Sequence, residues 1–274
     1  MILVISSENY ATKRLLEEAK ALGIPLEVMS AEELKQKRFK INVSKYQSIY
    51  IRNPYVNGSP KYLPNIVKLA KQFNTAGKKV VDLNIAHGKL GQGKWLDYKV
   101  LIKEKIKIPI TALIHGRALD KYKFPLVLKW IYGFKAKNVF FVENKDQLSK
   151  ILPLHPKQEW LVQEFIKADY EYKIMTVGYK ALPVVSKFGI NKNGFRTDFN
   201  NHKTLKSSAF PKIIRLAEKA SKALGRELAK VDVLQKGNRL YILEVNRFPG
   251  LDSFEILTKY NVTKQFIKYL SRPN

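Results

Sequence analysis

The sequence predicts an α/β fold, with a small parallel α/β domain at the N-terminus and an α+β arrangement in the rest of the chain. The first observation is that short apolar runs alternate with amphipathic segments over residues 1–92, a pattern typical of a parallel sheet. The second is that β-rich runs and separate helices dominate after that point. The third is the composition of the 274 residues, 45% apolar and 27% charged, which suits two or three small packed units and excludes a disordered chain.

The N-terminal elements follow from the positions of the apolar residues. Residues 1–6 form an apolar run typical of a buried parallel strand. A helix predicted over residues 10–22 ends at Gly23, and its apolar face is expected to carry Leu15, Leu16, Ala19 and Leu22. Further strands are predicted over residues 25–29, 48–52 and 80–83, with a helix over residues 61–73.

The remaining elements follow a glycine-rich junction. Residues 88–93 lack the Gly-Lys-Ser/Thr ending of a phosphate-binding loop, so we interpret them as a connection between domains. Beyond them, helices are predicted over residues 95–105, 212–224 and 263–270. Strands are predicted over residues 125–130, 139–142, 160–166 and 172–177, and a hairpin over residues 231–246.

The composition excludes several kinds of chemistry. The chain has no cysteine, which excludes disulfides, thiolate metal sites and cysteine nucleophiles and fits a cytoplasmic location. The apolar start is interpreted as a strand rather than a signal peptide, and no apolar run is long enough to span a bilayer. A formal net charge of +27 attracts polyanions. A specific acidic partner, a genome-wide lysine bias and growth at high temperature are all open explanations of that charge.

Lys129 is unusual for its surroundings. It lies near the end of the apolar run of residues 125–130. An ammonium group inside a buried strand is costly unless an anion meets it. Two interpretations stay open from this segment alone: Lys129 holds a phosphate, or it lies on an edge strand and points to water.

The hairpin predicted over residues 231–246 carries the second signal. Side chains alternate along a strand, so Glu244 and Asn246 are expected on one face. By the same alternation, Leu243 and Val245 are expected on the opposite face.

Asp232 joins this polar face if the connection is odd in length. The turn is expected at residues 236–239, and Asp232 would then lie opposite Glu244. Two carboxylates and an amide oxygen would converge, a donor set that suits Mg²⁺; a solvated polar face is the alternative. Pro249 and Gly250 break the strand soon after and either expose N–H groups to an anion or form a plain turn.

Other segments carry weaker signals. The run Gln163-Glu164-Phe165-Ile166 ends a predicted strand, and its backbone groups could contact a purine edge. No Gly-x-Ser-x-Gly motif or Ser/His/Asp set is present. Four histidines lack metal-binding spacing: His87, His115, His155 and His202.

In this order, the pieces resemble the ATP-grasp superfamily and, within it, the RimK-like amino-acid ligases. The matching runs are residues 93–101, 124–129, 162–166, 171–173, 194–196, 231–234 and 243–251. The resemblance covers residues 94–270 and extends more loosely to residues 1–93. It implies an ATP-grasp fold, with a small N-terminal parallel α/β domain and two α+β lobes that hold ATP between them. The expected boundaries are 1–92 for the N-terminal domain, 93–166 for the central lobe and 167–274 for the C-terminal lobe with the Mg²⁺ site.

The resemblance implies a role for each matching polar residue. Two lysines are expected on the nucleotide phosphates: Lys94 and Lys129. Adenine contacts, largely through the backbone, are expected from Gln163, Glu164, Phe165 and Ile166. Glu171 corresponds to the acidic residue on the ribose, and Lys173 completes the nucleotide-binding set.

The same resemblance implies metal and catalytic residues. The Mg²⁺ ligands, with Mn²⁺ as an alternative ion, correspond to Asp232, Glu244 and Asn246. Arg196 corresponds to a catalytic basic residue near the transferred phosphate or the substrate carboxylate, and Lys129 is expected to assist there.

Two segments depart from the family pattern. The glycine-rich loop over the phosphates corresponds to residues 133–138, which keep one glycine and contain Lys135 and Lys137. The asparagine that usually follows the arginine is replaced by Asp198. The lid over ATP and the substrate geometry are therefore where this chain is expected to differ.

The activity implied is amide formation through an acylphosphate, from ATP, a carboxylate and an amine. Glutamate or another acidic amino acid is expected to be joined to a peptide, a protein tail or a carrier, and the basic surface suits an acidic acceptor. A pterin- or deazaflavin-type acceptor is one alternative, and a non-catalytic RNA- or ribosome-binding protein is another. A homo-oligomer is expected, with no membrane partner and no sequence-specific nucleic acid.

Overall fold

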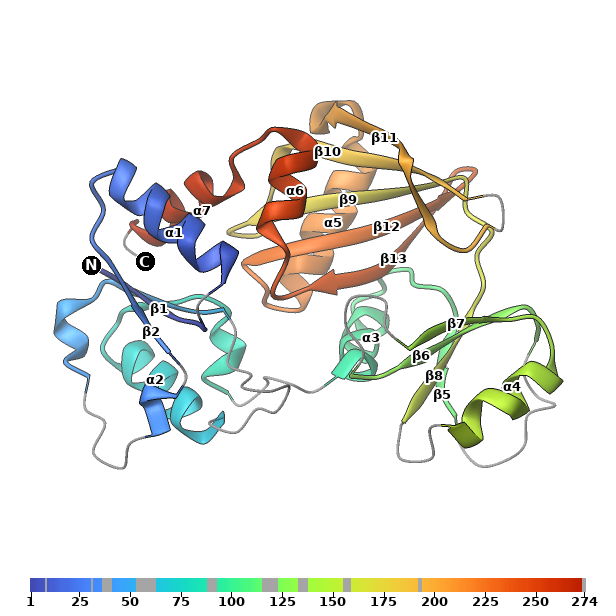
Figure 1. The fold of residues 1–274 in the computed structure, drawn as a ribbon, viewed down its shortest axis with the longest axis horizontal. Helices are drawn as coiled ribbons and strands as arrows, with labels where there is room; N and C mark the ends of the chain where they lie inside the picture. The colour runs from blue at the N-terminus through green and yellow to red at the C-terminus, as the bar shows by residue number, and fades with distance from the viewer. Residues whose placement is uncertain are drawn as a thin grey trace.

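The fold is mixed α/β and is built on three sheets in the part of the chain that the structure, a computed structural model, describes (Figure 1). Those residues are 1–7, 9–30, 32–35, 41–52, 63–87, 93–114, 123–132, 138–154, 159–191 and 194–272. Within these ranges, no helix is both long enough and apolar enough to cross a membrane. The predicted fold class is confirmed.

The N-terminal sheet is parallel and has the order β2-β1-β3-β4. Its strands are β1 (Ile2–Ile5), β2 (Leu26–Met29), β3 (Ser48–Ile51) and β4 (Lys79–Val80). Two helices flank it, α1 (Tyr10–Ala21) and α2 (Leu63–Thr75). Successive residues of β1 alternate between the apolar clusters of the two helices, which explains why the whole strand is apolar.

Two N-terminal predictions were wrong in detail. Leu16 is 42% exposed, because the apolar face of α1 is narrower than its leucine content suggests. The strand predicted over residues 80–83 ends at Val80, since Asp82 adopts a left-handed conformation (φ 58°) and the chain turns into a short 3₁₀ helix.

The second sheet is antiparallel and has the order β5-β8-β6-β7. Its strands are β5 (Thr111–Leu113), β6 (Leu126–Trp130), β7 (Val139–Val142) and β8 (Trp160–Glu164). The helices of this region are α3 (Gly93–Lys103) and α4 (Lys145–Ile151). Because β6 lies between two other strands, Lys129 does not occupy an edge strand, and that alternative is excluded.

The third sheet is antiparallel, with the order β11-β10-β9-β12-β13. Its strands are β9 (Tyr170–Val177), β10 (Lys180–Ile190), β11 (Thr197–Lys206), β12 (Leu228–Lys236) and β13 (Arg239–Asn246). Three helices complete it, α5 (Pro211–Ala223), α6 (Leu251–Thr258) and α7 (Val262–Leu270). Helix α5 packs on one face. Helices α6 and α7 cover part of the other face and also contact α1, so the last helices join the N-terminal domain to this sheet.

The register of the β12–β13 hairpin places Asp232 opposite Glu244, as predicted, but for another reason. The loop between Lys236 and Arg239 holds two residues, an even number. A β-bulge at Leu243 adds the extra residue and shifts the pairing by one position. Leu243 therefore packs with the apolar cluster of Leu234 and Tyr241, whereas Val245 belongs to the cluster beneath α5. The prediction that Leu243 and Val245 share one face was wrong.

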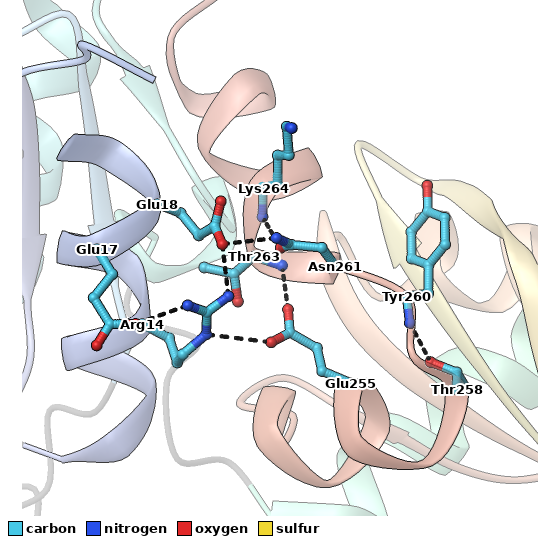
Figure 2. Close-up of polar contacts among 9 residues, drawn as sticks. All are labelled: Arg14, Glu17, Glu18, Glu255, Thr258, Tyr260, Asn261, Thr263 and Lys264. Carbon is cyan, nitrogen blue, oxygen red and sulfur yellow. Dashed lines mark hydrogen bonds and ion pairs between the residues drawn. The ribbon is translucent and has the colours of Figure 1, made fainter. Parts of the chain in front are cut away.

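A charged network fixes the N-terminal domain to the last helices (Figure 2). Arg14 on α1 contacts Glu17 and Glu18 on its own helix and Glu255 on α6, at 2.7, 2.6 and 3.5 Å. Glu18 also accepts a 2.7 Å hydrogen bond from Asn261, just before α7. Because the network is partly buried, it is expected to stabilise the docking more than an exposed ion pair would.

Two buried acids form a second contact between the N-terminal domain and the third sheet. The Asp82 amide donates to Glu227 at 2.7 Å, and the Glu227 amide donates to Asp82 at 2.9 Å. Arg247 contacts the other oxygen of Asp82 at 3.1 Å. Burial raises the pKa of Asp82 to about 7 despite the opposing charge of Arg247. Burial also raises the pKa of Glu227.

Asp82 should make the protein less stable as the pH rises. A carboxyl with a raised pKa in the folded state favours folding below pH 4, and this contribution is lost as the pH rises to about 7. Asp82→Asn keeps an acceptor for the Glu227 amide and removes the titration. We expect a smaller fall in melting temperature between pH 4.5 and 7 than in the wild type, with Asp146→Asn on exposed α4 as control. An unchanged slope in the Asp82 variant would contradict this assignment.

Candidate active site

Charged side chains from the second and third sheets meet where the two lobes face each other. Lys94, near the start of α3, forms an ion pair with Glu244 of β13. This contact joins the two lobes directly. On the third sheet, the neighbouring pairs are Asp232 with Glu244 and Asp232 with Lys173, so these three side chains lie on one face. The structure thus brings together most of the polar residues that the sequence singled out.

Glu244 is the acid that the lobes share. Burial would raise its pKa, but the charge and hydrogen bond of Lys94, with support from Lys129, lower the pKa of Glu244 overall. Glu244 is therefore held as a carboxylate. It is matched by cations that come from the opposite lobe.

Asp232 is less well satisfied. Its Oδ2 atom accepts a long hydrogen bond (3.4 Å) from the amide nitrogen of Asn246, and the ammonium group of Lys173 is 3.9 Å away. Its Oδ1 atom is buried and has no hydrogen-bond partner in the described part of the chain. Burial raises the pKa of Asp232 against the opposing charge of Lys173. A buried carboxylate oxygen without a partner calls for a cation or a donor at this position.

Lys129 is buried in the middle of the second sheet, with 8% of its surface exposed. Burial lowers its pKa to about 8, and the neighbouring charge of Lys94 acts in the same direction. Glu244, Glu171 and Asp232 oppose the shift only in part. An anion beside Lys129 would offset the cost of burying its charge.

Glu171 is a second buried acid, on β9. It forms an ion pair with Lys173 and accepts a hydrogen bond from the hydroxyl of Thr197. Burial lowers the pKa of Lys173, but Asp232 and Glu171 more than reverse that effect and raise it overall. Lys173 is therefore a permanent cation at the centre of the third sheet.

The arrangement fits the predicted magnesium site. Asp232 and Glu244 are paired across two strands, and Asn246 lies next to them. Within the described ranges, no group of three or more histidine or acidic side chains is placed to hold a metal ion, so the set rests on two carboxylates and one amide. The buried, unpartnered oxygen of Asp232 is the observation that favours a cation here. The ligand assignment stays a prediction.

The predicted adenine-contacting segment ends β8 and leads to the third sheet. Gln163 is buried and donates to the hydroxyl of Thr111 at 2.8 Å. The amide of Glu164 already donates to the carbonyl of Ile110, so this amide is occupied within the sheet. Ile166 belongs to a buried apolar cluster with Leu234 and Tyr241.

The aromatic ring of Phe165 packs against Phe141 of β7, with ring centroids 4.8 Å apart. Phe141 in turn contacts Phe195, just before Arg196. The guanidinium group of Arg196 donates to the carbonyl of Val139 at 3.0 Å, so it lies against the second sheet. Arg196 links the two lobes here, and its predicted catalytic role stays a prediction.

Three contributors were missed in the sequence. Lys230 lies two residues before Asp232 on the same face and pairs with Asn246 across the hairpin. Its charge opposes the burial that raises the pKa of Asp232 and helps to lower the pKa of Glu244. Alternation along β12 was a sufficient signal for it. Thr197 and Tyr98 act through hydrogen bonds to distant residues, for which the sequence carries no signal.

Two expectations cannot be placed. Residues 133–137 of the expected phosphate loop lie outside the described residues, and so do His115 and His155. The junction segment of residues 88–92 also lies outside them.

Comparison with known proteins shows which sequences and structures this chain resembles. A sequence model described as the RimK-like ATP-grasp domain matches residues 91–270. A protein of Rhodopirellula baltica named probable alpha-L-glutamate ligase is 26% identical over 291 residues, which cover 98% of this chain and 70% of that protein.

Solved structures show the same fold at low sequence identity. The ATP-grasp ligase PsnB, in complex with a phosphomimetic variant of a minimal precursor, Mg and ADP, has a TM-score of 0.75 and 12% identity, with coverage of 98% of this chain and 97% of that chain. The macrocyclase MdnC, bound to precursor peptide MdnA from Microcystis aeruginosa MRC, has a TM-score of 0.71 and 13% identity, covering 99% and 100%. The predicted ATP-grasp fold is thereby confirmed.

Lys129 should reduce the stability of the protein without nucleotide. A lysine with a lowered folded-state pKa costs stability while it is charged, on the order of 3 kcal/mol for the shift to about 8. We expect Lys129→Met to raise the melting temperature at pH 7 and to abolish the further rise that ATP and Mg²⁺ cause. The gain should shrink as the pH rises past 8 toward 10. Lys103→Met on exposed α3 is the control, and a nucleotide-induced rise retained by Lys129→Met would refute the assignment.

Proposed function

The chain belongs to the RimK-like ATP-grasp family and is an ATP-dependent ligase that forms carbon–nitrogen bonds; from this premise we propose that it joins an acidic amino acid, glutamate above all, to a peptide, protein tail or carrier. The observation that carries the proposal is the meeting of lysines from one lobe with paired acids from the other. Lys94 and Lys129 face Asp232 and Glu244. Such a set suits a triphosphate and its divalent cation.

The residues of this site would bind and enclose the reacting groups. A Mg²⁺ ion held by Asp232, Glu244 and Asn246 would supply neutralisation of phosphate charge. Lys94 contacts Glu244, and it would turn to phosphate oxygens when the cation takes that carboxylate. Lys173 contacts Glu171 and lies 3.9 Å from Asp232, so it would stay beside the phosphates as a second cation. Lys129, which is buried, would meet a phosphate where water is excluded.

The reaction then follows from the groups present. A substrate carboxylate attacks the γ-phosphate, and the bond to the β-phosphate oxygen breaks to give an acylphosphate and ADP. An amine attacks the acyl carbon, the carbon–oxygen bond to phosphate breaks, and an amide forms. The lysines hold the phosphate groups in both steps, and the closed lobes protect the acylphosphate from water.

Relatives support the choice of substrate. The similar protein of Rhodopirellula baltica is named a probable alpha-L-glutamate ligase, and one of Haemophilus ducreyi with the same name is 29% identical over 210 residues. PsnB and MdnC were solved with a precursor or precursor peptide. We therefore favour a peptide or protein acceptor over a pterin- or deazaflavin-type acceptor, and a working ligase over a non-catalytic RNA-binding protein.

Helix α5, which packs on the face of the third sheet opposite Asp232, carries an exposed row of cations that suits an acidic chain. Four cations at intervals of three and four residues form its exposed side: Lys212, Arg215, Lys219 and Lys222. The helix has one acidic residue, Glu218, which contacts Lys180 and the amide of Ala181. The four cations span about 15 Å, the length of roughly four to five residues of an extended acidic chain.

ADP release identifies the activity. We expect the wild type to release ADP from ATP and Mg²⁺ only with an acidic amino acid and an acceptor, in a panel of the twenty amino acids with and without a hexaglutamate peptide. Glu244→Ala removes a carboxylate that the proposal places on the metal and should release none. ADP release independent of the amino acid, or retained by Glu244→Ala, would contradict the proposal.

The acceptor's charge can be tested separately. If α5 holds an acidic chain, the KM for hexaglutamate should rise severalfold between 50 and 200 mM salt, since exposed charges are screened over a Debye length of about 10 Å at 0.1 M. Lys219→Gln/Lys222→Gln should raise that KM at low salt. Lys264→Gln/Lys268→Gln on α7 changes the net charge equally and should not. Equal effects of both pairs would mean that net charge alone acts.

A further inference from the structure

The carboxyl edge of the N-terminal sheet faces the candidate active site. In the order β2-β1-β3-β4, the chain leaves β1 and β3 toward opposite faces, with α1 on one side and α2 on the other. Ligands of open parallel sheets bind at the carboxyl ends of the strands at such a switch point. Arg52 follows β3 there, and its amide donates to the carbonyl of Ile5 at the end of β1 at 3.0 Å.

The side chain of Arg52 is incompletely satisfied. The residue is 8% exposed. Its Nη2 atom donates to the carbonyl of Pro249 at 3.3 Å, and its Nη1 atom is buried and has no partner among the described residues. A guanidinium group carries five donors in a fork that matches a carboxylate, so one long bond to a carbonyl leaves most of its capacity unused.

A second donor lies beside it. The Tyr50 hydroxyl, on the same side of β3, is buried next to Arg52, and no acceptor for its proton lies within hydrogen-bond distance in the described ranges. Burial raises the pKa of this hydroxyl, and the nearby charge of Arg52 opposes the shift only in part. Tyr50 is therefore a neutral donor. The Nη1 atom of Arg52 and the proton of the Tyr50 hydroxyl both lack an acceptor among the described residues, and buried polar groups are otherwise paired, so this position favours an anionic group.

The position of Arg52 is fixed relative to the reacting centre. Pro249 is three residues beyond Asn246, the predicted metal ligand at the end of β13. Between them, Arg247 is held by Asp82 of the N-terminal domain. Two arginines thus anchor the short segment after Asn246 to the N-terminal domain: Arg247 lies on the segment itself, and Arg52 lies on the domain.

We propose that Arg52, with Tyr50, binds a substrate carboxylate that is not consumed in the reaction. This inference rests on the proposed function, because it assigns a residue to the substrate of that site. The proposed function places the nucleotide phosphates against Lys94, Lys129 and Lys173, which leaves Arg52 for a different anion. A dicarboxylate such as glutamate keeps at least one free carboxylate while it is joined, and Arg52 selects for that group.

Binding measurements test the assignment without turnover. The probes are L-glutamate and its two monoamides, L-glutamine and L-isoglutamine, titrated by calorimetry into the protein with a non-hydrolysable ATP analogue and Mg²⁺. We expect the wild type to prefer glutamate to one monoamide by about 10- to 100-fold, the range for a hydrogen-bonded charge. The weaker monoamide identifies which carboxylate Arg52 holds.

Variants decide between a binding role and a structural role. Arg52→Met should abolish that preference, and Arg52→Lys should keep part of it because the charge stays and the fork is lost. Tyr50→Phe preserves the packing on Phe266 and should reduce the preference by roughly 3- to 10-fold. If Arg52 only tethered Pro249, all three ligands would weaken equally. A ratio unchanged from the wild type in Arg52→Met, or no preference in the wild type, would overturn the proposal.

ADP release separates this inference from the proposed function. A wild type that binds glutamate through Arg52 but releases no ADP with any acceptor would contradict the ligase proposal alone. A different result would contradict the role of Arg52 alone: ADP release in which Arg52→Lys discriminates glutamate from the two monoamides as strongly as the wild type does. An unchanged response to nucleotide would confirm that the variant is folded.

Discussion

The pairing of Asp232 with Glu244 is the constraint on which the site depends. Two carboxylates on adjacent strands repel each other, and because Asp232 is buried and Glu244 half-buried, they stay ionised together only if cations meet them. The bulge at Leu243 creates this pairing. The bulge also frees the Leu243 carbonyl, which accepts a hydrogen bond from the Tyr98 hydroxyl of α3 at 2.9 Å. The same helix supplies Lys94 for Glu244 and Asp97 for Arg226, so it links both the backbone and the charges of the hairpin to the second lobe.

The charged groups between the lobes lower the stability of the protein when no ligand is bound. Lys129 is buried with a lowered pKa, and one oxygen of Asp232 has no partner among the described residues. Both features destabilise a protein that holds nothing between its lobes, and both become favourable when a phosphate meets the lysine and a cation meets the acid. Binding sites whose side chains are in place before the ligand binds are typically less stable than well-packed regions in this way. The two buried defects are therefore better explained by function than by packing.

The sequence was informative where one strand determines its own pattern. The apolar runs predicted β1 and β3, and the polar residues in β6, β12 and β13 predicted Lys129 and the acids. It was uninformative where another segment decides. Strands β10 and β11 were not predicted. Strand β11 is polar and exposed, and its extended conformation depends on pairing with β10. The bulge at Leu243 lies where the Tyr98 hydroxyl, far away in the chain, donates to the Leu243 carbonyl. A two-residue loop therefore gave the predicted pairing of Asp232 with Glu244 through a bulge that alternation along the strand does not predict.

The N-terminal domain is docked directly beside the candidate site. Arg14 and its acidic partners attach α1 to α6 and α7, and Asp82 exchanges hydrogen bonds with Glu227 beside the third sheet. These contacts hold the carboxyl edge of the parallel sheet against the segment that leaves Asn246, which is where Arg52 reaches Pro249. The first contact is carried by long charged side chains and the second by buried acids, so both respond to pH and salt more than an apolar interface would. A substrate carboxylate bound at Arg52 would add a third link between the same two parts. Binding of substrate and docking of the domain would then reinforce each other, since whatever stabilises one contact lowers the cost of forming the other.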